Sequence, residues 1–226
     1  MNTEPPFPNS NGDLTEAHLI EGVIFLAGRD ADLAAVYGQF GPPPLWAREP
    51  GFPTLLYIIL EQQVSLASAR AAFQRLAAAI SPITPQAFLE LNDAELKVIG
   101  FSRQKTGYGR LLAQAILAGE IELAGLAALE DDAVRAQLTK LKGIGRWSAD
   151  IYLMEALLRP DVWPSGDLAL AVAVQRVKRL EAVPGAVELE AIGEAYRPWR
   201  AVAARMFWHY YLSNPMRRAV VRVEEK

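Results

Sequence analysis

The sequence contains no cysteine and only two histidines, His18 and His209, among its 226 residues. Disulfides, thiolate zinc sites, Cys-ligated iron–sulfur clusters and a cysteine nucleophile are therefore excluded, and neither a His-rich metal centre nor a Ser–His–Asp triad is expected. No apolar run reaches membrane-spanning length, and the first thirteen residues lack the basic and apolar regions of a signal peptide. A cytoplasmic protein without membrane association is the expectation.

Basic residues are not in excess either, since 23 Lys and Arg face 26 Asp and Glu, for a formal net charge of −3. Taken alone, this balance argues against a protein that holds nucleic acid by bulk electrostatics. Hydrophobic residues make up 51% of the chain and charged residues 22%. That composition excludes a disordered or fibrous chain and allows a sizeable core, in one domain or in two closely packed lobes.

The local patterns predict an all-α chain, because alanine is abundant and no alternating strand pairs joined by Asn-Gly or Asp-Gly turns are found. Apolar residues over 54–80 recur at helical spacing and predict one continuous helix there. Later helices have recognisable N-terminal caps: Thr84 before Pro85, Asn92 with Glu95 in a capping-box pattern, and Ser102. Further helices are expected over 130–141, 168–180, 188–196 and 199–212.

Proline and glycine mark the boundaries. Residues 1–14 contain Pro5, Pro6 and Pro8 and are expected to form a loose N-terminal tail. The loop 41–44, Gly-Pro-Pro-Pro, and the break at Arg159-Pro160 are the best internal boundaries.

The most informative segment is 141–149, Leu-Lys-Gly-Ile-Gly-Arg-Trp-Ser-Ala, which lies between two helical patterns. Gly143 and Gly145 permit a tight turn, and Ile144 between them is expected to anchor that turn in the core. Backbone N–H groups remain uncovered at the start of the second helix, where the helix dipole also favours negative charge. A phosphate fits such a site, although an ordinary helix–turn–helix corner would have the same sequence features.

The pattern Leu-x-Gly-Ile-Gly-x-x-x-Ala is the helix–hairpin–helix signature, and Asp167 follows Gly145 by 22 residues in the segment Trp-Pro-Ser-Gly-Asp-Leu, 163–168. Together these features resemble the helix–hairpin–helix base-excision DNA glycosylase superfamily. Within it, the chain is most similar to the alkylation-repair glycosylases of the DNA-3-methyladenine glycosylase II type. Segments 59–65, 99–105 and 196–208 also resemble that family, so the resemblance covers about residues 15–212.

The resemblance implies a two-lobed fold with a cleft between the lobes, in a single domain over 15–226. The middle lobe would be about 51–159, with the hairpin at 139–149, and the second lobe about 15–50 plus 160–226. It also implies a hydrolase of N-glycosyl compounds that flips alkylated bases of the 3-methyladenine and 7-methylguanine type out of damaged double-stranded DNA, leaving an abasic site. A monomer, nucleoid-associated if bacterial, is expected.

Asp167 is the carboxylate that the resemblance places under the sugar ring. Hydrolysis of an N-glycosidic bond develops positive charge on that ring, and a carboxylate stabilises it and can orient water. Asp167 also follows Ser165-Gly166 at the start of a predicted helix, where aspartate is a favoured N-cap. Both roles can coexist, because a helix N-terminus favours the ionised form. Asp150 and Asp161 are weaker candidates.

A base in duplex DNA must leave the stack to be reached, and a cationic base then stacks well on aromatic rings. The resemblance implies a base pocket that contains Trp147, Trp208 and Ile151. Trp163, on the loop before Asp167, and His209, next to Trp208, are further candidates for this pocket. Core packing is the alternative for each tryptophan and is favoured for Trp46 and Trp199. Bifunctional family members carry a nucleophilic lysine at the position of Trp147, and tryptophan cannot form a Schiff base, so no lyase activity is expected.

Gln63 matches the family position that fills the hole left by the flipped base; alternatively, Gln62 and Gln63 simply face solvent. Candidate phosphate-binding residues are Gly143, Gly145, Arg146, Ser148, Lys142 and Lys105. No cofactor is required, but the resemblance suggests Na⁺ or K⁺ at the main-chain carbonyls of Thr139, Leu141 and Ile144.

Three alternatives remain open: another base specificity on the same fold, such as deaminated purines, a non-catalytic helix–hairpin–helix DNA-binding protein, and a helical scaffold that binds no DNA. The net charge does not exclude the glycosylase, because backbone N–H groups and a few local cations can hold phosphates. A small dependence of affinity on salt is then expected.

Overall fold

The computed structural model describes residues 13–214, which contain twelve α-helices, two short 3-10 helices and no strand. The expected all-α class is confirmed. The chain divides into two compact units. The first comprises Met1–Trp46 and Leu158–Lys226, and the second comprises Ala47–Leu157. Most of the predicted N-terminal tail lies outside the described residues, but its last residue, Leu14, is fully buried and its N–H donates to the Leu158 carbonyl at 2.7 Å.

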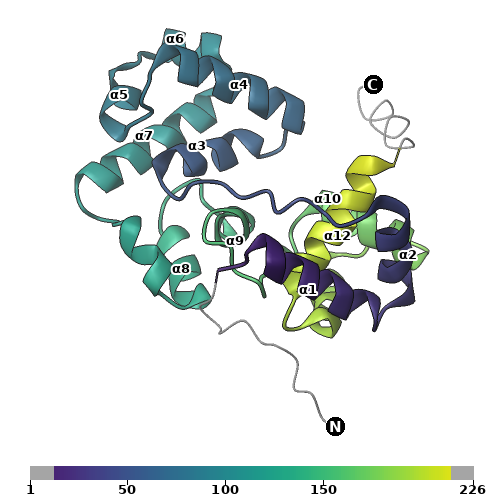
Figure 1. Cartoon of the computed structure of the whole chain (residues 1–226). Coiled ribbons are helices and arrows are strands. Elements are labelled where there is room, and N and C mark those ends of the chain that lie inside the picture. Colours follow the sequence, from purple (N-terminus) through teal and green to yellow (C-terminus); the bar gives the residue numbers. More distant parts are fainter. Residues whose placement is uncertain (1–12, 215–226) are drawn as a thin grey trace. The chain divides into compact units, whose positions relative to one another are not determined.

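The first unit is built around one buried helix (Figure 1). Its helices are α1 (Glu16–Ala27), α2 (Ala31–Phe40), α10 (Leu168–Lys178), α11 (Ala186–Gly193), the 3-10 turn η2 (Glu194–Tyr196) and α12 (Arg200–Ser213). Helix α12 is buried from Ala201 to Phe207 and packs against α1, α2 and α10. Gly22 on α1 allows this packing, because a Cβ at that position would lie 2.8 Å from the Trp199 ring.

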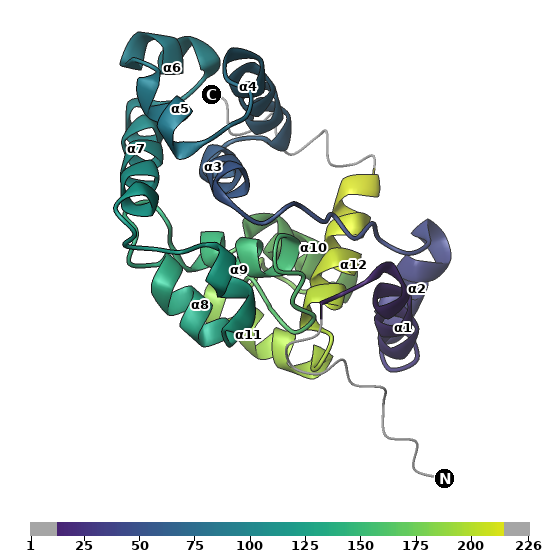
Figure 2. The same cartoon turned by 60° about the vertical axis from the view of Figure 1, so that its left-hand side comes forward.

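The helices of the second unit are α3 (Phe52–Glu61), α4 (Leu66–Ala79), α5 (Pro85–Glu90), α6 (Asp93–Ile99), α7 (Arg103–Leu117), η1 (Ala124–Ala128), α8 (Asp131–Leu138) and α9 (Arg146–Glu155). In this unit, α3 packs against three other helices, α4, α7 and α9. Every residue of α9 from Ser148 to Glu155 is buried, and the helix packs against α3 and α8 (Figure 2). The short connection from α8 therefore leads into a helix that is buried from Ser148 onward.

The predicted caps are confirmed. The Thr84 hydroxyl accepts from the Ala87 N–H, Asn92 and Glu95 form a capping box, and the Ser102 hydroxyl accepts from the Lys105 N–H. The continuous helix expected over 54–80 is wrong, because α3 ends at Glu61 and α4 begins at Leu66. Residues 62–65 form a turn between them, and the helix expected over 130–141 ends earlier, at Leu138.

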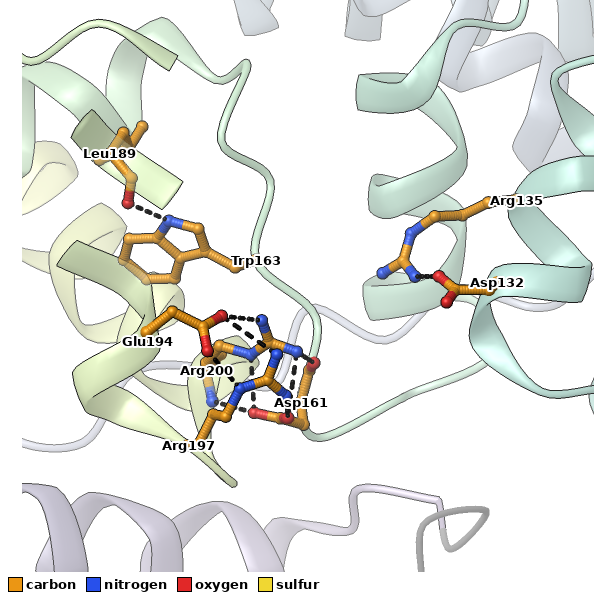
Figure 3. A network of polar contacts seen from close by, with 8 residues as sticks. All are labelled: Asp132, Arg135, Asp161, Trp163, Leu189, Glu194, Arg197 and Arg200. Atoms are coloured by element: carbon orange, nitrogen blue, oxygen red, sulfur yellow. Dashed lines mark hydrogen bonds and ion pairs between the residues drawn. The ribbon is translucent and has the colours of Figure 1, made fainter. Parts of the chain in front are cut away.

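The segment that follows Leu158, where the chain returns to the first unit, is fixed by a buried indole and by ion pairs (Figure 3). Trp163 is 2% exposed, and its Nε1–H donates to the Leu189 carbonyl at 2.8 Å. Next to it, Asp161 forms ion pairs of 2.8 Å with Arg197 and 3.0 Å with Arg200. These contacts hold the loop that leads to α10 against η2 and the start of α12.

Within residues 13–214, no helix has the length and apolar character needed to cross a bilayer, and the longest, α7, has 15 residues.

The close approach of Trp163 to Gly193 generates a stability prediction. A Cβ at Gly193 would lie 2.6 Å from the Trp163 ring, whereas a Cβ at Gly185 meets nothing within 4 Å. Gly193→Ala should therefore lower the free energy of unfolding by about 1–3 kcal/mol, because overpacking forces the indole off its carbonyl partner. Urea unfolding measures this, with Gly185→Ala as the matched control at an open position. Equal midpoints for the two variants would contradict the packing described.

Candidate active site

The turn between α8 and α9 has the tight geometry that the two glycines predict. Gly143 has a φ of +97°, and a Cβ on it would overlap the ring of Tyr108 from α7. Ile144 is 4% exposed and anchors the turn in the core as expected. Glycine is therefore required at position 143 for two reasons: its backbone is left-handed, and an aromatic ring packs against it where a Cβ would be.

Gly145 differs from Gly143 in both respects. It is the N-cap residue of α9, with an extended backbone (φ −92°, ψ −178°) and no side-chain hydrogen bond that caps the helix. A Cβ at this position would meet nothing within 4 Å. Neither the backbone nor the packing requires glycine here.

The turn between α3 and α4 separates the two glutamines that follow each other in the sequence. Gln62 ends α3, and its side-chain amide donates to the Gly143 carbonyl at 2.8 Å and to the Ser148 hydroxyl at 3.0 Å. Gln63 is exposed and has a left-handed backbone with a φ of +55°. Of the two glutamines, only Gln63 is presented outward on this turn.

The end of α3 has two further attachments within the second unit. The Lys105 ammonium donates to the Leu60 carbonyl at 2.7 Å, and desolvation lowers the pKa of Lys105 below its ordinary value. The Arg48 guanidinium makes two hydrogen bonds to the Glu61 carboxylate, at 2.8 and 2.9 Å, and an ion pair of 2.6 Å with Glu155 on α9. Bidentate pairs of this kind fix orientation as well as distance.

In the first unit, the Asp167 carboxylate lies at the N-terminus of α10. Its Oδ1 accepts from the Leu170 N–H at 2.6 Å, which makes Asp167 the N-cap, and from the Trp208 indole Nε1–H at 3.1 Å. The Trp46 ring meets the Trp208 ring edge-on, with 6.4 Å between the centroids. Asp167 thus carries one backbone and one indole hydrogen bond beside a pair of tryptophans, on elements that the α12 packing holds in place.

A sequence model of the HhH-GPD superfamily of base excision DNA repair proteins matches residues 56–198. The chain belongs to this superfamily. The matched segment contains the α3–α4 turn, the hairpin and Asp167, and the resemblance expected from the sequence is confirmed.

Several relatives of this HhH-GPD protein are named as glycosylases of 3-methyladenine. DNA-3-methyladenine glycosylase 1 of Schizosaccharomyces pombe is 26% identical over 197 residues, which cover 84% of this chain and 86% of the relative. The solved S. pombe 3-methyladenine DNA glycosylase in complex with abasic DNA superposes with a TM-score of 0.79 at 26% identity, covering 83% of this chain and 95% of that one. The crystal structure of a Bacillus halodurans DNA-3-methyladenine glycosidase superposes with a TM-score of 0.69 at 25% identity, covering 88% of this chain and 91% of that one.

Three predicted base-pocket residues of this HhH-GPD protein have defined contacts inside their own units. Trp163 belongs to the core, with its indole nitrogen on the Leu189 carbonyl, and Ile151 is 4% exposed inside α9. The imidazole of His209 forms a 3.0 Å hydrogen bond with the Phe40 carbonyl and packs edge-on against the Phe40 ring. These contacts direct His209 toward the end of α2. It points away from Trp208, because adjacent residues of a helix point about 100° apart. Trp147 is half-buried and Trp208 borders Asp167.

The predicted phosphate-binding residues also divide. Lys142 is exposed, and Arg146 is 63% exposed with a 3.7 Å ion pair to Asp150. Ser148 is 2% exposed, and its hydroxyl oxygen accepts from the Gln62 amide at 3.0 Å. Its role as a phosphate ligand stays a prediction. Lys105 is likewise bound to the Leu60 carbonyl. Asp150, one of the rival carboxylates, is buried and forms an ion pair of 2.6 Å with Arg135.

Sequence reasoning missed Gln62, Trp46 and Tyr108. Each is defined by a contact with a residue far away in the chain, such as the 81 positions between Gln62 and Gly143. For Trp46, its position two residues after the proline-rich loop 41–44 was an available signal, since a rigid loop can hold a nearby aromatic residue at the edge of a site.

The contrast between the two hairpin glycines can be tested by alanine substitution. Gly143→Ala should lower the free energy of unfolding by more than about 2 kcal/mol, because a left-handed backbone and a ring contact both oppose a Cβ. Gly145→Ala should leave the unfolding midpoint close to that of the parent protein. Thermal and urea unfolding of both variants measure the difference, and comparable losses at the two positions would show that Gly145 is also required for folding.

Proposed function

We propose that the chain is a DNA glycosylase that hydrolyses the N-glycosidic bond of alkylated bases of the 3-methyladenine and 7-methylguanine type in double-stranded DNA and leaves an abasic site. Membership of the HhH-GPD superfamily and the named activity of the S. pombe relative support this activity. The observation that carries the proposal is the Asp167 carboxylate, held at a helix N-terminus and hydrogen-bonded by the Trp208 indole.

The reaction needs negative charge where positive charge develops. As the bond between sugar and base lengthens, the sugar acquires oxocarbenium character, and a fixed carboxylate stabilises it in a site that excludes water. The Leu170 N–H and the Trp208 Nε1–H hold the carboxylate in one orientation, so little reorganisation is needed during the reaction. An alkylated purine leaves as a neutral base after carrying the positive charge itself, and therefore needs no strong general acid.

We propose that the Trp208 and Trp46 rings receive the flipped base. An electron-poor cationic base is attracted to the face of an indole by about 0.5–2 kcal/mol, depending on its desolvation. Trp147 is half-buried in the first turn of α9. It has no amine that could attack the sugar, so we propose a glycosylase without lyase activity.

DNA contact would come from the second unit. The positive end of the α9 dipole would attract one phosphate to the helix N-terminus, where Gly145 places no side chain, and Lys142 and Arg146 lie beside it in the sequence. Gln63 would occupy the gap that the flipped base leaves in the stack, and the exposed Val64 next to it adds apolar surface to this wedge. Few ionic contacts then contribute, in accord with the net charge of −3.

We propose that no cofactor is required, and that a monovalent cation can bind at the hairpin. The carbonyls of Thr139, Leu141 and Ile144 follow the carboxyl end of α8, the negative end of its dipole, and carbonyl oxygens suit Na⁺ or K⁺. The Leu141 carbonyl already accepts from the Ile144 N–H at 3.0 Å, but a carbonyl has a second lone pair. These residues fit such an ion, whose charge would favour a nearby phosphate.

The decisive test is Asp167→Asn on duplexes that carry single modified bases. Asparagine is as good an N-cap as aspartate, so the variant should fold and bind DNA like the parent protein while base release falls on the order of 100-fold or more. Asp93→Asn is the matched control, since its carboxylate is 82% exposed and pairs with Arg110 at the surface of the second unit. Abasic sites are detected by strand cleavage after alkali or heat.

Other results would point to the alternatives. Unchanged excision by Asp167→Asn would refute the mechanism, and release only of deaminated purines would replace the alkylated-base assignment. Binding without any base release by the parent protein would favour a non-catalytic DNA-binding protein. Cleavage of the strand without alkali or heat would contradict the absence of lyase activity.

A negative charge at the hairpin should separate folding from DNA binding. Gly145→Asp adds a capping carboxylate to α9 and should raise the unfolding temperature slightly, while DNA affinity falls about tenfold or more because the carboxylate takes the place of the phosphate. Gly185→Asp is the matched control, since Gly185 is also an N-cap residue without a side-chain cap, on α11. Fluorescence anisotropy with an undamaged duplex measures affinity, and equal losses in both variants would refute the hairpin site.

A further inference from the structure

The phosphate-binding hairpin and the wedge residue Gln63 belong to separate turns of the second unit, and one side chain connects them. Both hydrogen atoms of the Gln62 amide nitrogen have acceptors: the Gly143 carbonyl at 2.8 Å and the Ser148 hydroxyl at 3.0 Å. The first acceptor precedes the open N-cap Gly145, and the second lies in the first turn of α9. Gln62 therefore holds both sides of the turn that would contact the phosphate.

The residues before Gln62 are fixed as well. Lys105 holds the carbonyl of Leu60, and Arg48 holds the carboxylate of Glu61 and ties it to Glu155 on α9. Three consecutive residues at the end of α3 are thus attached through a carbonyl, a carboxylate and an amide. After them, the backbone enters the left-handed region at Gln63, a conformation that non-glycine residues keep only when their surroundings impose it.

We propose that Gln62 is a positioning residue that sets the place of the Gln63 wedge relative to the phosphate-binding hairpin, and that this coupling drives base extrusion. The inference rests on the proposed glycosylase function. A wedge helps to extrude a base only if the backbone of the same DNA is held while the wedge enters the stack. The Gln62 amide supplies a short link between the two, because it contacts the hairpin directly and precedes Gln63 by one peptide bond.

A positioning role and a purely structural role predict different results. Loss of the link should impair the step that takes a paired base out of the stack, and it should spare a base that is already unpaired. General damage to the fold would impair both substrates alike. The ratio of excision from a paired site to excision from a single-nucleotide bulge is therefore the informative readout.

The experiment compares single-turnover excision of 7-methylguanine opposite cytosine with excision of the same base in a bulge. Gln62→Met keeps the length of the side chain and removes both donors. It should lower excision from the paired site about tenfold or more, and from the bulge by less than roughly threefold. Ser148→Ala removes one acceptor and should give an intermediate change of the same ratio. Gln74→Met, at an exposed position on α4, is the matched control and should change neither rate.

The outcomes are distinguishable. Equal losses on both substrates, or no loss on either, would overturn the coupling while leaving the glycosylase function intact. A parent protein that releases no base even from the bulge would overturn the proposed function and the coupling with it. Fluorescence of 2-aminopurine placed next to the lesion gives an independent check, since its rise on binding should be slower in Gln62→Met if the wedge is displaced.

Discussion

Every α-helix leaves N–H groups in its first turn and carbonyls in its last turn without partners inside the helix. The α-helices within residues 13–214 have between 6 and 15 residues, so such ends are frequent, and side chains cap many of them. The candidate functional groups lie at these ends as well. Asp167 caps α10, Gln62 and Gln63 follow the end of α3, and Gly145 begins α9 without a side-chain cap. The same requirement that builds the fold therefore also places the chemistry.

The second unit shows how this requirement links distant parts of the chain. The carbonyl at the end of α3 is satisfied by Lys105 from α7, and the amide that follows it satisfies the Gly143 carbonyl of the hairpin. The hairpin itself depends on the Tyr108 ring, again from α7. Helix α7 thus supports both turns that would contact DNA. The buried helix α9 packs against α3 and α8, the helices that precede these two turns.

The sequence predicted those features of the fold that depend on interactions between residues close together in the chain. The caps Thr84, Asn92 and Ser102, the tight turn at 143–145 and the all-α class follow from interactions within a few residues. The break between α3 and α4 does not, since residues 62–65 contain neither glycine nor proline and the apolar spacing continues across them. The partners that fix this break are 81 and 86 positions away. For the same reason, the core position of Trp163 and the burial of Ser148 required three-dimensional information.

The double role that we propose for Asp167, as N-cap and as catalytic carboxylate, has an evolutionary consequence. Its carboxylate stabilises α10 as an N-cap, but asparagine serves that purpose equally well. Codons for aspartate and asparagine differ by one nucleotide, so a single mutation could abolish catalysis while leaving folding, abundance and DNA binding unaffected. Selection for stability does not oppose such a change, and only exposure to alkylating damage would remove it. A lineage released from that exposure could therefore convert the enzyme into a stable DNA-binding protein in one step.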